Sequence, residues 1–305
     1  MSAEPKVLEK PRPTTVTPLP ARGARSVLPE KRVVRRRTGR TLLIVGAILL
    51  AFFFYAFVVT GLEESRSQRA LLPVFAAGVQ AQSIDSISKV PVPGSPVALM
   101  EIPRIGLRRV VVEGSSPELL KLGPGHLPNT SLPGEFGNSV VLGRRLTYGA
   151  PFARLDEMQT GDSVTMITGQ GSFTYVVNRV AYVLPGQPDV TGPTLDSRLT
   201  LVTSGPSLSP TTRLVIVAAL QGNPVGVTTR PSVAVAPDEF GESGNVTGLL
   251  LAILWGVALV ALIFLTRRIY KVWPVRAAYV VTTPAVIFLL WLVFENLDRL
   301  LPGTL

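Results

Sequence analysis

The 305-residue chain contains no cysteine and a single histidine, His126. Without cysteine it can form no disulfide, offer no thiolate nucleophile and build no cysteine-ligated zinc site. One histidine leaves only a carboxylate calcium site as a conceivable metal centre, and no group of acidic residues in the sequence has the required spacing. We therefore expect no metal and no other cofactor.

Charged residues are also scarce. They make up 16% of the chain, whereas hydrophobic residues make up 47%, which is too apolar for a purely soluble protein. Three uncharged runs, at residues 41–60, 247–266 and 277–294, are each long enough to cross about 30 Å of hydrocarbon as a helix. Pro284 predicts a kink in the third run.

The basic excess lies beside these apolar runs. Residues 1–40 hold eleven basic and three acidic side chains, a net charge of +8, while residues 41–266 carry a net charge of −1 and residues 267–305 carry +3. This pattern fits membrane topology better than a nucleic-acid-binding surface. The positive-inside rule predicts that the N-terminus and the loop at 267–276 are cytoplasmic, and that residues 61–246 lie outside.

The sequence predicts a multi-pass plasma-membrane protein with nine segments. They are a disordered basic cytoplasmic tail (1–40), a first span (41–60), a juxtamembrane helix and linker (61–97), a β-domain (98–221), a Pro/Gly-rich linker (222–246), a second span (247–266), a basic cytoplasmic loop (267–276), a third span (277–294) and a short exported C-terminal tail (295–305).

The β-domain contains β-branched runs of four to ten residues, bounded by Gly, Pro, Asn and Asp. The clearest runs are ALMEIPRI, RRVVVEG, NSVVLGRR, SVTMITG, SFTYVVNRVAYVL, RLTLVTS and RLVIVAAL. The tripeptide GQG at 169–171 indicates a hairpin between two of them. Seven or eight short strands with little helical periodicity predict an all-β fold, either one closed barrel or a sandwich.

Four motifs of this domain resemble a known family in their sequence and order. They are IPRIGL at 102–107, LGPGHLPNTSLPGEFGNSVVLG at 122–143, RLTYGAPFARLDEMQTGDSV at 145–164, and RLTLVTS at 198–204 followed by Arg213. Together they resemble the sortases, most closely the actinobacterial, class E-like members. The resemblance implies a closed eight-stranded β-barrel on a membrane-anchored transpeptidase.

The same resemblance implies a catalytic cysteine, histidine and arginine, and this chain keeps only the arginine. Arg144 stands where the family has its histidine, Ser204 stands where it has its cysteine, and Arg213 matches the arginine. The chain is thus similar to a degenerate sortase that lacks the catalytic pair. His126 occupies a segment in which related sortases also carry a histidine distinct from the catalytic one, which favours a structural role.

These two replacements change the chemistry. A cysteine with an ordinary pKa near 8.5 can be shifted toward the thiolate by its surroundings, whereas a serine must lose its proton to a base as it attacks. Arginine is always protonated and is no base. The remaining candidate base for Ser204 is His126, and the simpler interpretation of Ser204 is a small polar residue in the space of a lost thiol.

Two arginines facing one cleft would repel each other without a counter-charge. One hypothesis is that Arg144, Ser204 and Arg213 bind an anion or a C-terminal carboxylate, because guanidinium groups suit carboxylate and phosphate. The alternative is that one arginine turns outward or pairs with a nearby carboxylate such as Asp162, Asp189 or Asp196. The neighbouring Arg145 matches an arginine of the family motif and is interpreted as structural.

The sequence therefore predicts a catalytically inactive, sortase-like membrane protein that binds a partner in the former substrate groove or serves as a subunit of a cell-envelope complex. The expected partners are the membrane and an envelope protein, a sorting-signal-like peptide or an anionic ligand, and not nucleic acid. The alternative function is a serine-dependent transpeptidase or hydrolase that uses Ser204, with His126 or another base.

Overall fold

The computed structural model describes residues 42–44, 46–81, 91–184, 188–205, 212–226, 231–232, 235, 239, 246–269, 275–300 and 303–304. The chain divides into two compact units, Met1–Ile48 and Leu49–Leu305, and the features below belong to the second. The predicted disordered tail at 1–40 lies outside the described residues.

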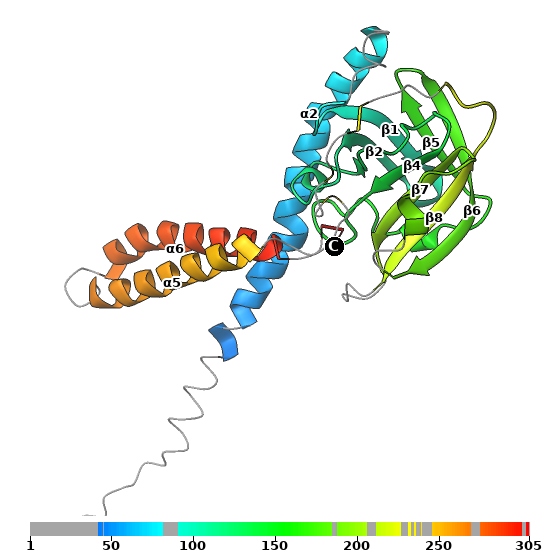
Figure 1. Cartoon of the computed structure of the whole chain (residues 1–305). Helices are drawn as coiled ribbons and strands as arrows, with labels where there is room; N and C mark the ends of the chain where they lie inside the picture. The colour runs from blue at the N-terminus through cyan, green and yellow to red at the C-terminus, as the bar shows by residue number, and fades with distance from the viewer. Residues whose placement is uncertain are drawn as a thin grey trace, which may run out of the picture. The chain divides into compact units, whose positions relative to one another are not determined.

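Eight strands form a closed barrel in the order β1-β2-β3-β4-β7-β8-β6-β5 (Figure 1). Their bounds are β1 Pro96–Ile102, β2 Leu107–Glu113, β3 Gly125–His126, β4 Asn138–Leu142, β5 Ser163–Thr168, β6 Gly171–Val183, β7 Arg198–Ser204 and β8 Arg213–Leu220. The predicted all-β barrel is confirmed. The sandwich alternative is wrong, because β1 pairs with β5 and leaves no open edge.

The strand runs seen in the sequence are all present, and the predicted hairpin at GQG joins β5 to β6 through the pair Thr168↔Gly171. The eighth strand, β3, is only two residues long and pairs in parallel with β2 and antiparallel with β4. A strand this short has no period-2 pattern to recognise in sequence. The connection from β1 to β2 is a 3-10 turn at Pro103–Ile105 that ends on Gly106 at φ +65°.

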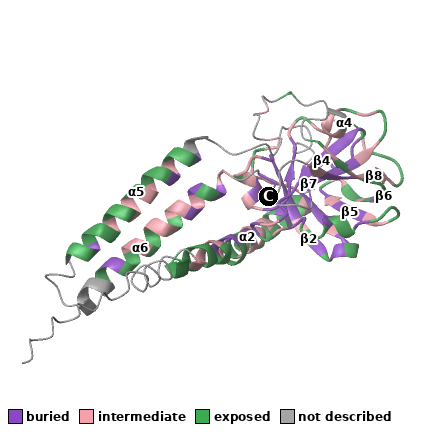
Figure 2. Cartoon of the chain, turned by 90° about the horizontal axis from the view of Figure 1, so that it is seen from below, coloured by how far each residue is buried: buried purple, intermediate pink, exposed green. Residues whose placement is uncertain are grey.

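The barrel interior is filled by apolar side chains from all the longer strands, and Figure 2 shows buried residues gathered in this part of the chain. Buried and partly exposed residues alternate along β5, because successive side chains of a strand point to opposite faces. Val164 and Met166 are among the buried residues and point into the barrel. The largest cluster includes Met100, Ile102, Val111, Val141, Phe152, Leu155, Met166, Tyr175, Leu199, Leu201, Leu214 and Ile216.

The helix that contains the predicted first span continues beyond residue 60. A helix apolar enough to cross a membrane runs from Leu42 to Gln80, through a π-helical turn at Tyr55–Val59 and into α2, Thr60–Ala81. The predicted juxtamembrane helix is therefore continuous with the span. α2 packs on β2 through Gln68, which bonds both the N–H (2.8 Å) and the C=O (3.0 Å) of Val110.

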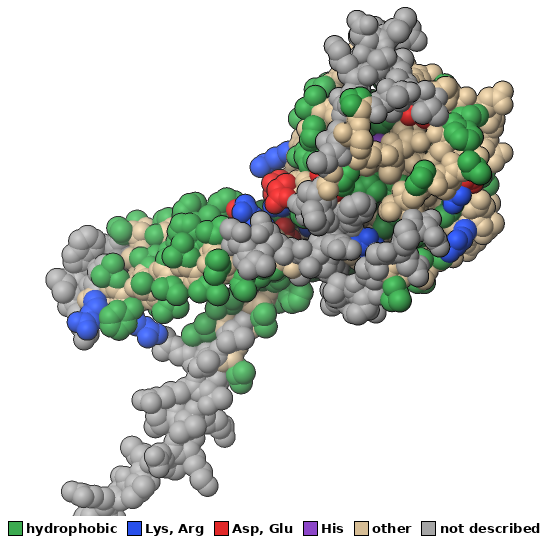
Figure 3. Space-filling view, in the orientation of Figure 1, with side chains coloured by type: hydrophobic (Ala, Val, Ile, Leu, Met, Phe, Trp, Pro, Cys, Tyr) green, Lys and Arg blue, Asp and Glu red, His purple; other side chains and the backbone are tan. Residues whose placement is uncertain are grey.

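Two further helices, α5 (Val246–Ile269) and α6 (Val275–Asp298), are long and apolar enough to cross a membrane. Apolar side chains cover their surface, and the basic residues Arg267 and Arg268 end α5 (Figure 3). α6 continues past the predicted boundary at 294 as far as Asp298, and Phe294 packs against Phe52 of the first span with ring centroids 5.3 Å apart.

Candidate functional site

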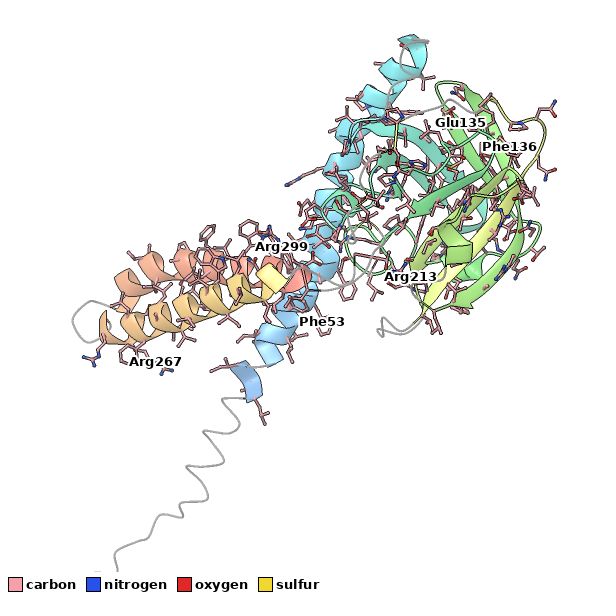
Figure 4. All side chains as sticks on the ribbon, in the orientation of Figure 1. Phe53, Glu135, Phe136, Arg213, Arg267 and Arg299 are labelled. Atoms are coloured by element: carbon pink, nitrogen blue, oxygen red, sulfur yellow. The ribbon has the colours of Figure 1, made fainter. Side chains whose placement is uncertain are left out.

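Strands β7 and β8 place the first two candidate residues side by side. Ser204 is the last residue of β7, Arg213 is the first of β8, and the two are register partners in an antiparallel pair (Figure 4 labels Arg213). Antiparallel partners have Cα atoms about 4.5 to 5.5 Å apart. The structure therefore brings together the residues at the predicted cysteine and arginine positions.

Ser204 is 3% exposed, and its hydroxyl lies 2.8 Å from the Oγ1 atom of Thr304. Thr304 is itself 2% exposed. The carbonyl oxygen of Thr304 accepts a hydrogen bond of 3.1 Å from the backbone N–H of Arg145. A residue of the C-terminal segment thus fills the space in front of Ser204.

Arg144 follows β4 and is 1% exposed. Its guanidinium donates to Thr147 Oγ1 at 3.0 Å and to the carbonyl oxygen of Pro117 at 2.8 Å. It also lies 4.6 Å from the ring centroid of Tyr148, and its Nη1 is 3.7 Å from Asp298 Oδ1 at the end of α6. Arg144 is therefore a buried cation held between a barrel loop and a membrane helix.

Two of the three carboxylates proposed as partners, Asp162 and Asp196, lie beside other arginines. Asp162 lies 3.8 Å from Arg104, and Asp196 pairs with Arg198 at 2.7 Å. The side chain of Asp189 lies outside the described residues. Asp298 was missed, because it is distant in sequence from the barrel and follows an apolar run that indicates only a membrane span.

Arg145 has the structural role expected of it. Its Nη1 donates to the carbonyl oxygen of Ser204 at 2.9 Å, and its Nη2 pairs with Asp156 at 2.9 Å. The backbone N–H of Arg145 also donates to the carbonyl oxygen of Thr304, so Arg145 connects the end of β7 to the C-terminal segment.

His126 lies elsewhere in the barrel. Its Nδ1 is 2.9 Å from Glu113 Oε2, and its Nε2 is 3.0 Å from both the Ser131 carbonyl oxygen and Thr130 Oγ1. His126 on β3 is the register partner of Val141 on β4, and Val141 is the register partner of Leu201 on β7. Ser204 therefore lies two strands away from His126 across the sheet and three residues further along β7. Each of these two displacements is roughly 10 Å. Both ring nitrogens of His126 are thus engaged, far from Ser204.

Burial shapes the electrostatics around Arg144. It lowers the pKa of the Arg144 guanidinium below its ordinary value, and Asp298 opposes that shift. Burial and then the negative charge of Asp298 raise the pKa of the Tyr148 phenol, so this group stays neutral. Among the described residues, the hydrogen bonds of Ser204 and Arg144 go to hydroxyl and carbonyl oxygens, and these do not accept a proton at neutral pH.

No group of three or more potential metal ligands occurs within the described part of the chain. The contacts that Ser204 and Arg144 make among the described residues are hydrogen bonds and a charge pair. Sequence reasoning treated residues 295–305 as a plain exported tail and so missed Thr304 and Asp298. The signal available was topological, since the three predicted spans would put residues 295–305 on the same side of a membrane as the barrel.

The barrel is similar to proteins of one family. The family model described as "Sortase domain" matches residues 100–221. Sortase D of Bacillus subtilis (strain 168) is 31% identical over 102 residues, which cover 33% of this chain and 50% of that protein. The chain therefore spans about half the length of this curated relative.

Solved structures are similar as well. A Sortase D5 transpeptidase of Clostridium perfringens is 27% identical with a TM-score of 0.47, and the match covers 52% of this chain and 99% of that one. Sortase E of Streptomyces avermitilis is 36% identical with a TM-score of 0.40, and the match covers 44% of this chain and 93% of that one.

Proposed function

We propose that the protein, whose residues 100–221 match the sortase-domain model, is a membrane-spanning, catalytically inactive sortase that holds a peptide in the former substrate groove, as a binding subunit of the cell envelope. The proposal includes the topology inferred from charge, with the barrel on the exported side. Whether it belongs with the class E-like sortases stays a prediction from the sequence motifs.

The observation that supports this function best is the hydroxyl pair of Ser204 and Thr304, 2.8 Å apart and buried. A serine nucleophile needs a base within about 2.6 to 3.2 Å, and general-base help contributes about 10² to 10⁴ in rate. A threonine hydroxyl cannot provide it, and His126 is bound to Glu113 on another strand. Among the described residues, Ser204 is therefore left with a hydroxyl partner and no base to take its proton.

The neighbouring arginines favour binding as well. The backbone N–H of Arg145 donates to the carbonyl oxygen of Thr304, and its guanidinium donates to the carbonyl oxygen of Ser204. Arg213 stands beside Ser204 at the start of β8. A guanidinium group suits peptide carbonyls and carboxylates and cannot abstract a proton.

A fluorophosphonate probe, which reacts with activated serines, tests the proposal. The full chain in membranes and its Ser204→Ala variant are treated with the probe between pH 6 and 9, and labelling is followed by gel fluorescence. We expect equal background in both proteins. Labelling of the parent chain that disappears in Ser204→Ala would instead establish the serine-dependent enzyme.

A further inference from the structure

We infer that the resident ligand of this groove is the chain's own C-terminal segment, and that Ser204 and Arg144 are the groups that receive it. This inference rests on the proposed function, because it identifies the peptide that a non-cutting groove binds. The segment would then control the site, since any other peptide must displace it first.

The contacts of the segment are specific. Thr304 pairs its hydroxyl with Ser204, and its carbonyl oxygen accepts from the backbone of Arg145. Gly303 lies so close to Pro117 that an added Cβ would be 3.2 Å from the proline ring. A buried threonine bonded through both hydroxyl and backbone is a docked residue, because an undocked tail would leave these groups to water.

The segment begins at a second anchor, Asp298, whose carboxylate faces the buried guanidinium of Arg144. An arginine keeps its charge at every physiological pH, whereas a histidine at this position would be mostly neutral near pH 7. A serine hydroxyl likewise donates and accepts stronger hydrogen bonds than a thiol. The two residues that depart from the catalytic pattern are thus the two that suit docking of the segment.

The tether makes binding within one chain efficient. Five residues separate Asp298 from Thr304, so their Cα atoms are at most about 20 Å apart. A short tether of this kind gives an effective concentration in the millimolar range. A free peptide of similar contacts therefore competes poorly unless the segment is released.

A disulfide trap tests occupancy, and the natural lack of cysteine removes any background. Hydroxyl oxygens 2.8 Å apart place the two Cβ atoms within disulfide reach, so the double variant Ser204→Cys/Thr304→Cys should close an intramolecular bond. The matched control is Thr203→Cys/Thr304→Cys, since the Thr203 hydroxyl faces the carbonyl of Gly143 instead. Both variants are oxidised mildly in membranes and then denatured in SDS, so that buried free thiols also react, and the free thiols are counted with PEG-maleimide.

We expect most of the Ser204→Cys/Thr304→Cys protein to be monomeric and unlabelled until it is reduced, and the control to be labelled at both cysteines. Equal labelling of the two variants would overturn the inference, and so would disulfide-linked dimers only. Neither result touches the proposed function. Conversely, Ser204-dependent probe labelling would refute the proposed function while leaving a positive trap intact.

Competition provides a second readout. A fluorescein-labelled peptide with the sequence of residues 299–305 is titrated into the full chain, into a chain ending at residue 300, and into Thr304→Val, which keeps the tail but removes its hydroxyl. We expect at least tenfold tighter binding to the shortened chain and a smaller gain for Thr304→Val, by fluorescence anisotropy. Equal affinity for all three proteins would contradict a resident tail.

Discussion

At the scale of single residues, the site is defined by what surrounds Ser204 and Arg144. A buried hydroxyl needs a hydrogen-bond partner and a buried cation needs a counter-charge. Thr304 supplies the first and Asp298 the second, and both come from the C-terminal end of the chain. Ser204 and Arg144 are therefore integrated into the packing, and Arg144 also lies over the ring of Tyr148.

Placing a cysteine at position 204 and a histidine at position 144 should show whether the docked C-terminal segment and a substrate peptide compete for the same site. The variant Ser204→Cys/Arg144→His regains a thiol and an imidazole, whose combined help is about 10² to 10⁴ in rate. We expect it to cleave a sorting-signal peptide only when the chain is also shortened to residue 300. Product formation followed by chromatography checks this, and equal turnover with and without the tail would contradict it.

The barrel core should show a marked alkaline limit. Burial raises the pKa of Tyr175 to about 12, against about 10 in an unfolded chain, and its hydroxyl accepts the Gly134 N–H at 2.7 Å. The stability from this raised pKa is fully present below pH 10 and is lost as the pH rises toward 12, because unfolding then releases a proton.

The contribution of Tyr175 to this loss is about 2 to 3 kcal/mol at most. Tyr175→Phe should therefore flatten the fall of the melting temperature between pH 10 and 11.5, while lowering stability near pH 7 by about 1 kcal/mol through the lost hydrogen bond. Thermal unfolding of the parent chain and of Tyr175→Phe between pH 7 and pH 11.5 measures this change in melting temperature. If the melting temperature of Tyr175→Phe falls with pH as steeply as that of the parent chain, groups other than Tyr175 cause the alkaline loss of stability.

At the scale of elements, the sequence predicted the barrel well, because each long strand carries alternation and clear turn residues. It did not locate β3, where two residues carry no pattern, and it did not predict that the apolar run and the polar residues of α2 form one continuous helix. It singled out Arg144, Ser204 and Arg213 by their positions in the motifs, and their role as a binding site stays a prediction. It could not predict Asp298 and Thr304, since contacts between α6 and the barrel depend on folding in three dimensions.

The junction of α6 with the barrel should be held chiefly by the Arg144–Asp298 pair. Removing one partner of a buried ion pair typically costs about 3 to 5 kcal/mol, because the other charge stays buried. We expect Asp298→Ala to destabilise the protein by that order and to free the tail for proteolysis. Glu295→Ala is the matched control one turn earlier in α6, where the partly exposed pair with Arg299 is worth below about 1 kcal/mol.

The combination Arg144→Met/Asp298→Ala completes a double-mutant cycle. A folded double variant that is more stable than Asp298→Ala alone would show that the lone cation caused the loss. Purely additive effects in the cycle would contradict an ion pair between these residues.

At the scale of the whole molecule, the account requires three spans with the barrel and the C-terminus on one side. Arg267 and Arg268 end α5 at the loop end of its hairpin with α6, and Arg299 lies at the other end (Figure 4). Only this topology gives the tail access to the groove on an exported barrel.

Single cysteines test the topology, because the parent chain has none to interfere. Leu195→Cys, at a side chain that is 95% exposed on the barrel, should react with a membrane-impermeant maleimide on intact cells. Arg268→Cys should react only after permeabilisation. The reverse pattern, or labelling of Arg268→Cys from outside, would contradict the proposed orientation.

The central claim, that the groove grips a peptide and does not cut it, is tested most directly by intact-mass spectrometry of the chain ending at residue 300. The purified protein in detergent is incubated with the synthetic peptide of residues 299–305, and both components are weighed. The account predicts that the peptide co-elutes with the protein, keeps its full mass and leaves no covalent adduct. Peptide fragments or an added mass on the protein, each lost in Ser204→Ala, would contradict it.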